Sequence, residues 1–358
     1  MNSCPFPVSR ALAQINTSAL VHNLRTVSTM CAGRTIAVVK ANAYGHGIDL
    51  VVPALTRAGC DFFAVATPEE ALAVRSLSPG ADILILGYTP PRLAPLLAKE
   101  RLTQSVFSAP YALALCAAAS TPVSIHLKIN SGMCRLGFDI EDATGLGVAL
   151  HAPKLTVRGL FTHLPSVTTS PAATAASIAK FSALRRSLPS LFAHVAATGA
   201  LTIPEARFDG VRPGLALYGY SGKDQLPLRP AMRVLAPIIQ IRSVDVGTPV
   251  GYDGAFVTKR PSRIGVLPLG YADGLCRALE GLRVRLCAGK GAGFAPIVGH
   301  ICMDHCMIDL TDTDAKEGDT VCVISNFKDV AARRGSIVYE ALTSLSPRLE
   351  RQQREEDT

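Results

Sequence analysis

Short apolar runs alternate with helix-like stretches through the first two thirds of this chain. Each run is rich in Val, Ile, Phe and Ala and ends at a turn, a pattern typical of buried parallel strands. The predicted strands are Thr35–Val39, Phe62–Ala66, Ile83–Gly87, Gln104–Phe107, Ser124–Ile129, Val157–Thr162, Ala193–Ala196 and Arg207–Val211. The stretches between them have helical spacing and good helix formers, among them Ile48–Ala58, Pro68–Ser76, Ala109–Ala119 and Ala172–Ser187.

This alternation predicts a (β/α)8 TIM-type barrel, which needs roughly 200 to 250 residues. A doubly wound sheet is the competing architecture, but no G-x-G-x-x-G motif follows the first predicted strand. The motif Thr67-Pro68-Glu69-Glu70 predicts a helix start, because a capping hydroxyl, a first-turn proline and acids favour that end.

The pattern changes after the polar, proline-containing segment Ser221–Pro230, which we interpret as a domain boundary. Later runs are β-like and are separated by glycine and proline turns, so we expect a smaller all-β domain over residues 231–358. The barrel then occupies residues 1–230, although its first segment, Ala11–Asn16, is a candidate strand for the β domain.

Composition narrows the class of protein. With 358 residues, 48% hydrophobic and 18% charged, the chain is globular. No apolar run reaches the roughly 20 residues that span a bilayer, and Met1–Ala13 lacks the features of a signal peptide, so we expect a cytoplasmic enzyme without a membrane partner. The net charge of +8 comes from dispersed basic residues, which argues against a nucleic-acid partner.

The ten cysteines are interpreted as reduced thiols. His300, Cys302, His305 and Cys306 lie close together in sequence. Their spacing differs from the usual zinc pattern of paired ligands separated by a long interval, so we predict no metal site.

The segment from Ala37 to Gly47 carries the strongest chemical signal. A buried run ends at Lys40, and a glycine-containing turn with Tyr44 and His46 follows. Burial disfavours ammonium, and a neutral amine is what an aldehyde cofactor needs to form a Schiff base. A lysine that merely extends to solvent is the alternative interpretation.

Together with motifs further along, this segment resembles the alanine racemases, from about Ile15 to Arg351. The resemblance implies a barrel followed by a β domain, pyridoxal phosphate (PLP) bound through Lys40, and a head-to-tail homodimer with shared active sites. It also implies interconversion of L- and D-alanine, which supplies D-alanine for cell-wall peptidoglycan.

The loops after the seventh and eighth predicted strands, Thr198-Gly199 and Arg212–Gly219, stand where barrels often bind phosphate. The resemblance places Arg212 against the pyridine nitrogen, with His163 and His194 orienting it. It assigns the cofactor phosphate to Tyr44, Thr198, Gly214, Leu215 and Tyr339.

Racemisation needs two acid–base groups on opposite faces of the α-carbon. The resemblance assigns these roles to Lys40 and Tyr252, with Tyr252 reaching the other subunit's barrel. In the same resemblance, Arg135 steers the substrate carboxylate and lies near Tyr252. Lys128 is a candidate for carbamylation, and the carbamate would hold Arg135 in place. The remaining substrate-side residues implied are Met303, whose N–H binds the carboxylate, Asp304 in the same loop, and Tyr271 at the entrance.

Three positions depart from the family pattern: Cys134 stands at a frequent glycine or histidine, Ala197 at a usual polar residue and His300 at a frequent arginine. Serine or broad-specificity racemisation is a second candidate, because one sequence does not fix the volume of the substrate pocket. A PLP-dependent decarboxylase of the same architecture is a third, but the chain lacks a GGG phosphate loop. A non-catalytic PLP carrier is disfavoured because such proteins end near the barrel.

Overall fold

The computed structural model describes residues 10–222, 226–287 and 293–354. The chain divides into two compact units: one holds residues 17–229, and the other holds the N-terminal segment to Asn16 together with the chain from Pro230 onward. Residues 223–225 of the predicted boundary segment lie outside the described residues.

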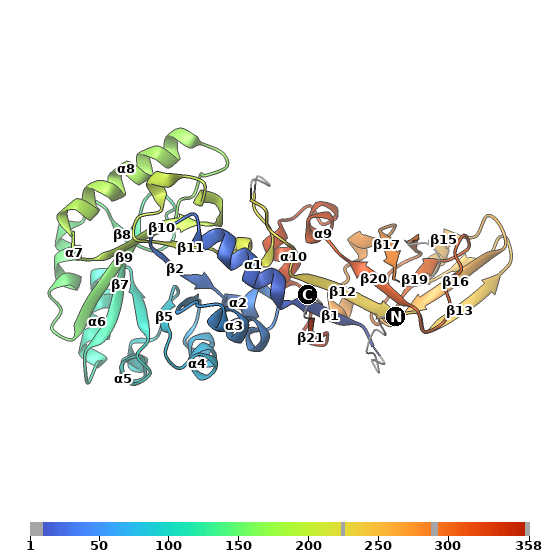
Figure 1. The fold of residues 1–358 in the computed structure, drawn as a ribbon, viewed down its shortest axis with the longest axis horizontal. Helices are drawn as coiled ribbons and strands as arrows, with labels where there is room; N and C mark the ends of the chain where they lie inside the picture. The colour runs from blue at the N-terminus through green and yellow to red at the C-terminus, as the bar shows by residue number, and fades with distance from the viewer. Residues whose placement is uncertain (1–9, 223–225, 288–292, 355–358) are drawn as a thin grey trace. The chain divides into compact units, whose positions relative to one another are not determined.

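The unit of residues 17–229 is a nearly closed barrel of parallel strands with helices outside it (Figure 1). Within the described residues the ring runs in the order β2-β11-β10-β9-β7-β6-β5-β4-β3. Its strands are β2 (Arg34–Thr35), β3 (Ala37–Val38), β4 (Phe62–Val65), β5 (Asp82–Ile85), β6 (Thr103–Val106), β7 (Val123–Asn130), β9 (Leu155–Phe161), β10 (Phe192–Ala197) and β11 (Gly210–Arg212). The short β8 (Phe138–Asp139) pairs with the end of β7.

Strands β2 and β3 are two halves of one strand, separated only by Ile36. The first half pairs with β11 and the second with β4. Between them, Ile36 N donates to Val211 O at 2.8 Å, and Val38 N donates to Pro213 O at 3.0 Å. The ring is therefore joined through this strand, and the predicted (β/α)8 barrel is confirmed.

Several helices of this unit begin with a side-chain cap. Thr67 accepts from Glu70 N, Ser108 from Tyr111 N, Asp142 from Gly145 N and Ser170 from Ala173 N, which satisfies an otherwise unpaired first-turn donor. The helices of this unit are α1 (Thr17–Ser28), α2 (Lys40–Tyr44), α3 (Ile48–Arg57), α4 (Pro68–Leu77), α5 (Ala94–Lys99), α6 (Ala109–Ala118), α7 (Ala143–Leu150) and α8 (Pro171–Ser187).

The predicted eighth strand, Arg207–Val211, is displaced in the structure. Pro204–Ala206 forms a 3₁₀ turn, and only Gly210–Arg212 pairs as β11. The Asp209 carboxylate accepts from Ala193 N at 2.8 Å and from Arg185 at 3.1 Å. These side-chain bonds hold the preceding residues in a turn and delay the start of the strand.

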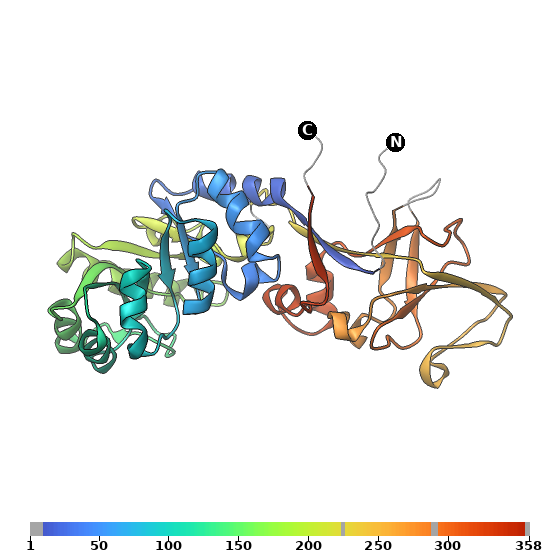
Figure 2. The ribbon, with the colours of Figure 1, turned by 90° about the horizontal axis from the view of Figure 1, so that it is seen from below.

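The other unit is built on a nine-stranded sheet in the order β13-β16-β19-β18-β17-β20-β12-β1-β21. β1 (Leu12–Asn16) lies between β12 and β21, antiparallel to the first and parallel to the second, as Figure 2 lets the reader follow. The other strands are β12 (Met232–Pro237), β13 (Gln240–Val244), β16 (Ser262–Leu267), β17 (Arg283–Leu286), β18 (Phe294–Val298), β19 (Cys306–Asp309), β20 (Thr320–Ile324) and β21 (Glu350–Arg354).

A small hairpin of β14 (Pro249–Val250) and β15 (Phe256–Val257) projects from this sheet and packs on it through Val250, Ile264 and Val298. Two short helices, α9 (Phe327–Arg333) and α10 (Val338–Thr343), follow β20. This β unit after the barrel is the second domain that the sequence predicts.

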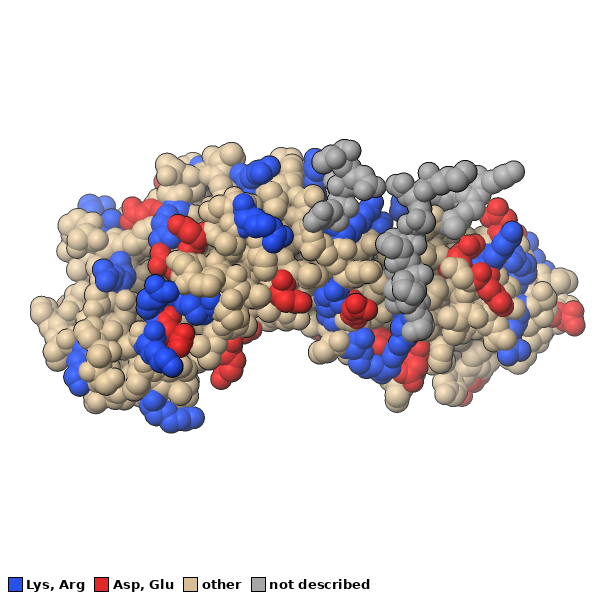
Figure 3. Space-filling view, turned by 60° about the horizontal axis from the view of Figure 1, so that its bottom comes forward, with Lys and Arg blue, Asp and Glu red and all other residues tan. Residues whose placement is uncertain are grey.

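The surface carries its charge in dispersed form. On the face drawn in Figure 3, Lys and Arg side chains are spread over both units with Asp and Glu among them. None of the helices in the described ranges has the length and apolar character needed to cross a membrane.

Candidate active site

Arg212 is a buried cation at the end of β11, with only 4% of its surface exposed. Its Nη1 donates to His194 Nδ1 and to His194 O, both at 2.6 Å. Its Nη2 donates to Thr162 O at 2.6 Å and to Val195 O at 3.0 Å. Burial lowers the pKa of Arg212 to about 9. Nε makes no hydrogen bond within the described residues, so the guanidinium is fixed by its terminal nitrogens alone.

Two buried histidines extend this arrangement behind Arg212. A guanidinium can only donate, so His194 Nδ1 accepts, its Nε2 carries the proton, and that proton is donated to His126 Nδ1 at 2.8 Å. Burial, reinforced by Arg212, lowers the pKa of His126 to about 3 and that of His194 well below its usual value. Both imidazoles are therefore neutral at physiological pH and act as fixed dipoles.

Lys128 lies near the end of β7, and it is only 7% exposed. Its Nζ lies 4.9 Å from the centre of the Phe161 ring, and the Arg212 guanidinium lies 5.1 Å from the same ring. Burial first, then Arg212 and Arg135, lowers the pKa of Lys128 to about 6. The same causes, with Lys128 and Lys40 added, lower the pKa of His163 to about 3. Burial and the positive charges of Arg212 and Arg135 therefore favour the neutral forms of Lys128 and His163 at this end of the barrel.

Lys40 follows β3 and is partly exposed. Burial is the main cause that lowers its pKa, and the positive charge of Arg135 lowers it further, while the Glu70 carboxylate acts in the opposite direction. Lowering the pKa raises the fraction of neutral amine at a given pH, which is the nucleophilic and basic form of lysine.

The turn after Lys40 is left-handed. Ala41, Asn42, Ala43 and Tyr44 have φ between 52° and 53°, a conformation that costs non-glycine residues roughly 1–2 kcal/mol each. The Glu70 carboxylate stabilises it by accepting from Ala41 N at 2.6 Å and from Ala66 N at 2.7 Å. Asn42 Oδ1 accepts from Ile48 N at 2.8 Å. These contacts from α3 and α4 fix the direction in which Lys40 and Tyr44 leave the strand.

The loops after β10 and β11 meet the Tyr44 side chain. Thr198 Oγ1 accepts from Gly214 N at 3.2 Å and from Ala216 N at 3.1 Å. A Cβ on Gly214 would lie 2.4 Å from the Tyr44 hydroxyl oxygen, so only glycine fits there. The Tyr44 ring stacks on the buried Tyr218 ring, with centroids 4.8 Å apart. We call Tyr44, Thr198, Gly214 and Leu215 the hydroxyl cradle.

Arg135 lies in an exposed loop between β7 and β8. Asn130 Oδ1 accepts from Gly132 N at 3.2 Å and from Cys134 N at 3.1 Å, which fixes the loop at its base. Cys134 has φ of 52°. Glycine adopts this left-handed conformation at lower cost than cysteine.

Tyr252 lies in the β unit, in a tight turn between β14 and β15, with 67% of its surface exposed. Gly251 before it has φ of 76°, and Asp253 after it has φ of 56°. A Cβ on Gly251 would lie 2.8 Å from the Met307 side chain, so the turn sits close against the sheet and presents the phenol outward.

Tyr271 and Met303 are also exposed, by 46% and 52%. Their loops are joined through the main chain, because Tyr271 N donates to Cys302 O and Ala272 N donates to Met303 O, both at 3.0 Å. A Cβ on Gly270 would lie 2.3 Å from both carbonyl oxygens. The two predicted substrate-side residues therefore lie on adjoining loops of one surface.

The remaining predicted residues of this unit are Asp304 and Tyr339. Asp304 accepts from Arg348 at 2.6 Å, and Tyr339 lies on α10 with its pKa raised by burial. His300 lies 3.0–3.1 Å from the Glu280 carboxylate. Within the described residues no three His, Cys, Asp or Glu side chains group as metal ligands.

The barrel brings Lys40, Lys128, Arg135, His163 and Arg212 within electrostatic range of one another. Sequence reasoning missed further residues that shape the two surfaces. A polar residue inside an otherwise apolar predicted strand was the available signal for His126, and the helix-start motif contained Glu70. The missed residues are Glu70, His126, Phe161, Tyr218, Asp273 and Arg348.

Comparisons with known proteins agree with this geometry. The family model "Alanine racemase, N-terminal domain" matches residues 15–222, and "Alanine racemase, C-terminal domain" matches residues 231–353. Alanine racemase 2 of Caldanaerobacter subterraneus subsp. tengcongensis is 36% identical and covers 94% of this chain and 93% of its own.

Solved structures give the same result. The alanine racemase of Clostridium difficile 630 has a TM-score of 0.91 at 29% identity, over 98% of this chain and 97% of its own. The alanine racemase from Bartonella henselae, solved with covalently bound pyridoxal phosphate, has a TM-score of 0.85 at 32% identity, over 97% and 100% of the two chains.

Proposed function

The chain belongs to the alanine racemase family, whose members are isomerases, and we propose that it interconverts L- and D-alanine with pyridoxal phosphate. One observation carries the proposal: a lysine of lowered pKa and the hydroxyl cradle lie at the same end of the barrel, joined by the left-handed turn between Lys40 and Tyr44.

The residues present fit the cofactor. Lys40 is the amine that would hold it covalently. The hydroxyl cradle offers two hydroxyl groups in a space that a Cβ would fill, and one of them, on Thr198, is oriented by Gly214 N and Ala216 N, which suits a phosphate group. The resemblance adds Tyr339 to this set. When bound, pyridoxal phosphate supplies an electron-poor ring that acidifies the proton on the substrate's α-carbon.

Arg212 faces the pyridine nitrogen in this proposal. Its four hydrogen bonds leave only the Nε–H to donate. His194 and His126 are neutral, and each is fixed in one tautomer. The Arg212–His194–His126 chain therefore has no acidic proton that it could transfer to the pyridine nitrogen. Arg212 thus keeps the ring nitrogen unprotonated, which favours simple return of the α-proton over other outcomes.

Two groups move the proton. Lys40 takes or returns it on one face of the α-carbon, since its lowered pKa makes the neutral amine accessible. Tyr252 acts on the other face, from the second subunit of a head-to-tail homodimer. The 67% exposure of Tyr252 supports a role in reaching another chain.

The substrate carboxylate is held between the two units of different subunits. Arg135 offers a planar donor fork, and the Met303 N–H, with Tyr271 and Asp304 beside it, completes the pocket. Lys128 carries a carbamate that holds Arg135; the low pKa of Lys128, about 6, supports this because only a neutral amine adds carbon dioxide.

The proposal includes a role in supplying D-alanine for peptidoglycan, and a cytoplasmic location. The described cysteines are free thiols, which suits a reducing compartment.

Incubation with L-alanine in D₂O tests the reaction. We expect D-alanine carrying deuterium at the α-carbon, and Lys40→Ala should abolish both the product and the visible absorbance of the bound cofactor. Release of carbon dioxide would instead favour the decarboxylase alternative. A panel of amino acids with chiral product analysis separates alanine from serine or broad specificity.

Subunit mixing tests the shared site. Lys40→Ala and Tyr252→Phe homodimers should each be nearly inactive, whereas a mixture contains hybrid dimers with one intact site. Activity that stays at the level of the separate variants after exchange would contradict the head-to-tail arrangement.

A further inference from the structure

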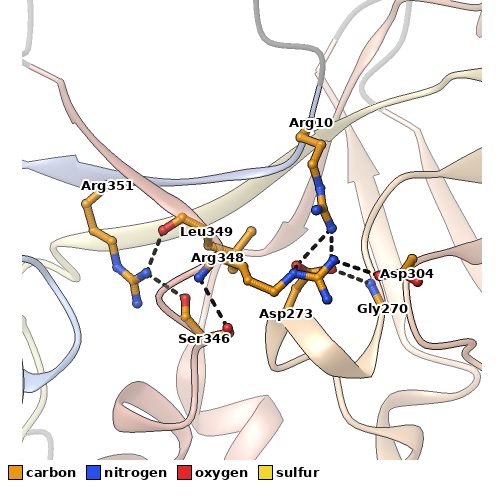
Figure 4. A network of polar contacts seen from close by, with 8 residues as sticks. All are labelled: Arg10, Gly270, Asp273, Asp304, Ser346, Arg348, Leu349 and Arg351. Atoms are coloured by element: carbon orange, nitrogen blue, oxygen red, sulfur yellow. Dashed lines mark hydrogen bonds and ion pairs between the residues drawn. The ribbon is translucent and has the colours of Figure 1, made fainter.

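Asp273 is a buried carboxylate between two arginines in the β unit (Figure 4). It is 1% exposed. Its oxygens accept from Arg10 Nη2 at 3.0 and 3.1 Å and from Gly270 N at 3.0 Å, and Arg348 Nε lies 3.4 Å away. A carboxylate this deeply buried requires such partners, because losing them leaves a desolvated charge.

Arg348 extends the contact to a second acid. Its Nη2 donates to Asp304 Oδ1 at 2.6 Å, while its Nε faces Asp273. Asp304 directly follows Met303, and Asp273 ends the turn that begins at Gly270 and holds Tyr271. One guanidinium therefore ties together the two loops that carry the predicted substrate-side residues.

The segment that carries Arg348 is itself fixed. Arg351 Nη1 donates to Ser346 O at 2.6 Å and to Leu349 O at 2.5 Å. Ser346 N donates to Asp273 O at 3.1 Å, and its hydroxyl accepts from Arg348 N at 3.2 Å. Figure 4 shows the chain folded around these contacts. These hydrogen bonds fix the main chain at Arg348, so its side chain is in position without substrate.

The polar contacts add to the apolar packing of these loops. Leu269, Leu275 and Ile301 are buried beside them, whereas the side chains of Tyr271 and Met303 are each about half exposed and gain little from packing. Arg348 also balances the charge of Asp304, which would otherwise repel a carboxylate approaching the neighbouring Met303 N–H. Arg348 therefore makes the surface less negative for an anionic substrate. It also keeps the two loops in their relative positions.

We propose that Arg348 is a positioning residue for substrate binding: by bridging Asp273 and Asp304 it holds Tyr271 and the Met303 N–H in place and cancels the negative charge beside them. This inference rests on the proposed function, in which Met303 binds the substrate carboxylate. It assigns Arg348 to affinity for substrate and not to proton transfer.

Steady-state kinetics of the holoenzyme test the assignment. Arg348→Met should raise KM for alanine about tenfold and change kcat less than threefold. Arg348→Lys keeps the charge but lacks the planar fork that reaches both acids. Its KM should therefore lie between that of wild type and that of Arg348→Met. Arg242→Met, an exposed arginine on β13, is the matched control and should leave both constants unchanged.

A second measurement reports the loop without using activity. The chain has no tryptophan, so Tyr271→Trp places the protein's single tryptophan at the loop, where it can be excited selectively over tyrosine. Adding Arg348→Met should lower its nanosecond fluorescence anisotropy, and adding Arg242→Met should not. Unchanged anisotropy together with unchanged KM overturns the inference. A lowered kcat with unchanged KM also overturns it, because that is the signature of a merely destabilised enzyme.

The two proposals fail separately. A wild-type enzyme that does not racemise alanine contradicts the proposed function, and the anisotropy comparison still decides whether Arg348 holds the loop. A wild-type enzyme that racemises alanine, with Arg348→Met kinetically normal, leaves the proposed function intact and removes Arg348 from it.

Discussion

Replacing Lys128 with methionine should stabilise the protein, and by an amount that depends on pH. The Lys128 amine is 7% exposed, and burial with the charges of Arg212 and Arg135 lowers its pKa to about 6 in the folded protein. In the unfolded chain the pKa returns to its ordinary value of 10.5. Between these two values the unfolded chain binds a proton that the folded protein does not.

The sign and size follow from this difference. Stability increases with pH wherever the unfolded state binds more protons, by about 1.4 kcal/mol for each pH unit. At pH 7 the buried amine therefore lowers the free energy of unfolding by about 5 kcal/mol relative to its value at pH 10.5. Below pH 6 the cost levels off, because both states are protonated. Lys128→Met removes the cost and keeps a side chain of similar length.

Urea unfolding followed by far-UV circular dichroism measures the effect, in buffers free of carbon dioxide from pH 7 to pH 10. The difference in unfolding free energy between Lys128→Met and wild type should be largest at pH 7 and shrink steadily toward pH 10. Lys180→Met, which replaces a mostly exposed lysine on α8, should show no such trend. A Lys128→Met difference that stays flat with pH would refute the reasoning.

Bicarbonate should raise the unfolding free energy of wild type but not that of Lys128→Met, and so reduce the difference between them. The neutral amine adds carbon dioxide to form a carbamate anion and releases one proton, and that anion is attracted to Arg135 and Arg212. With ¹³C-bicarbonate, wild type should give a carbamate carbon resonance that Lys128→Met lacks. A missing resonance, with wild-type stability unaffected by bicarbonate, would contradict carbamylation.

Three further changes test the barrel end. Thr198→Val should weaken retention of pyridoxal phosphate at least tenfold and Thr198→Ser much less, measured by absorbance during dialysis, because the hydroxyl anchors two N–H groups. Gly214→Ala should also weaken retention, and adding Tyr44→Phe should restore part of it by removing the atom 2.4 Å from the new Cβ. Ala41→Gly should be neutral or stabilising in urea unfolding because it relieves a positive φ, whereas Ala73→Gly in α4 should cost about 1 kcal/mol; equal losses would contradict the left-handed strain.

Much of the barrel could be predicted because its signals are local. The strand at Phe62–Val65 is apolar on both faces and fully buried, and Thr67 caps α4 through the contact its side chain favours. The displaced start of β11 depends on the Asp209 carboxylate reaching Ala193. That contact joins residues sixteen positions apart, on either side of a turn, and a local pattern does not contain it.

The candidate site also combines residues that local motifs predict with contacts that depend on the fold. Lys40 and Arg212 were predicted from the sequence because each lies at the end of a predicted strand and matches a motif, and the structure places both at strand ends. The left-handed turn was not, because Ala-Asn-Ala-Tyr has no glycine and its conformation is imposed by Glu70. The partners of Asp273 were not identifiable either, because only the fold brings Arg10 to it across most of the sequence.

The split first strand of the barrel has a consequence during synthesis. Residues 34–38 leave the ribosome early, but the backbone partners of their second edge, residues 209–213, emerge only near the end of the domain. Throughout that interval the nascent chain carries an open sheet edge, which is the kind of surface that pairs with neighbouring chains. Slow translation of the segment before residue 213 should therefore increase aggregation of the newborn protein, and chaperone binding to this edge would be the cell's natural safeguard.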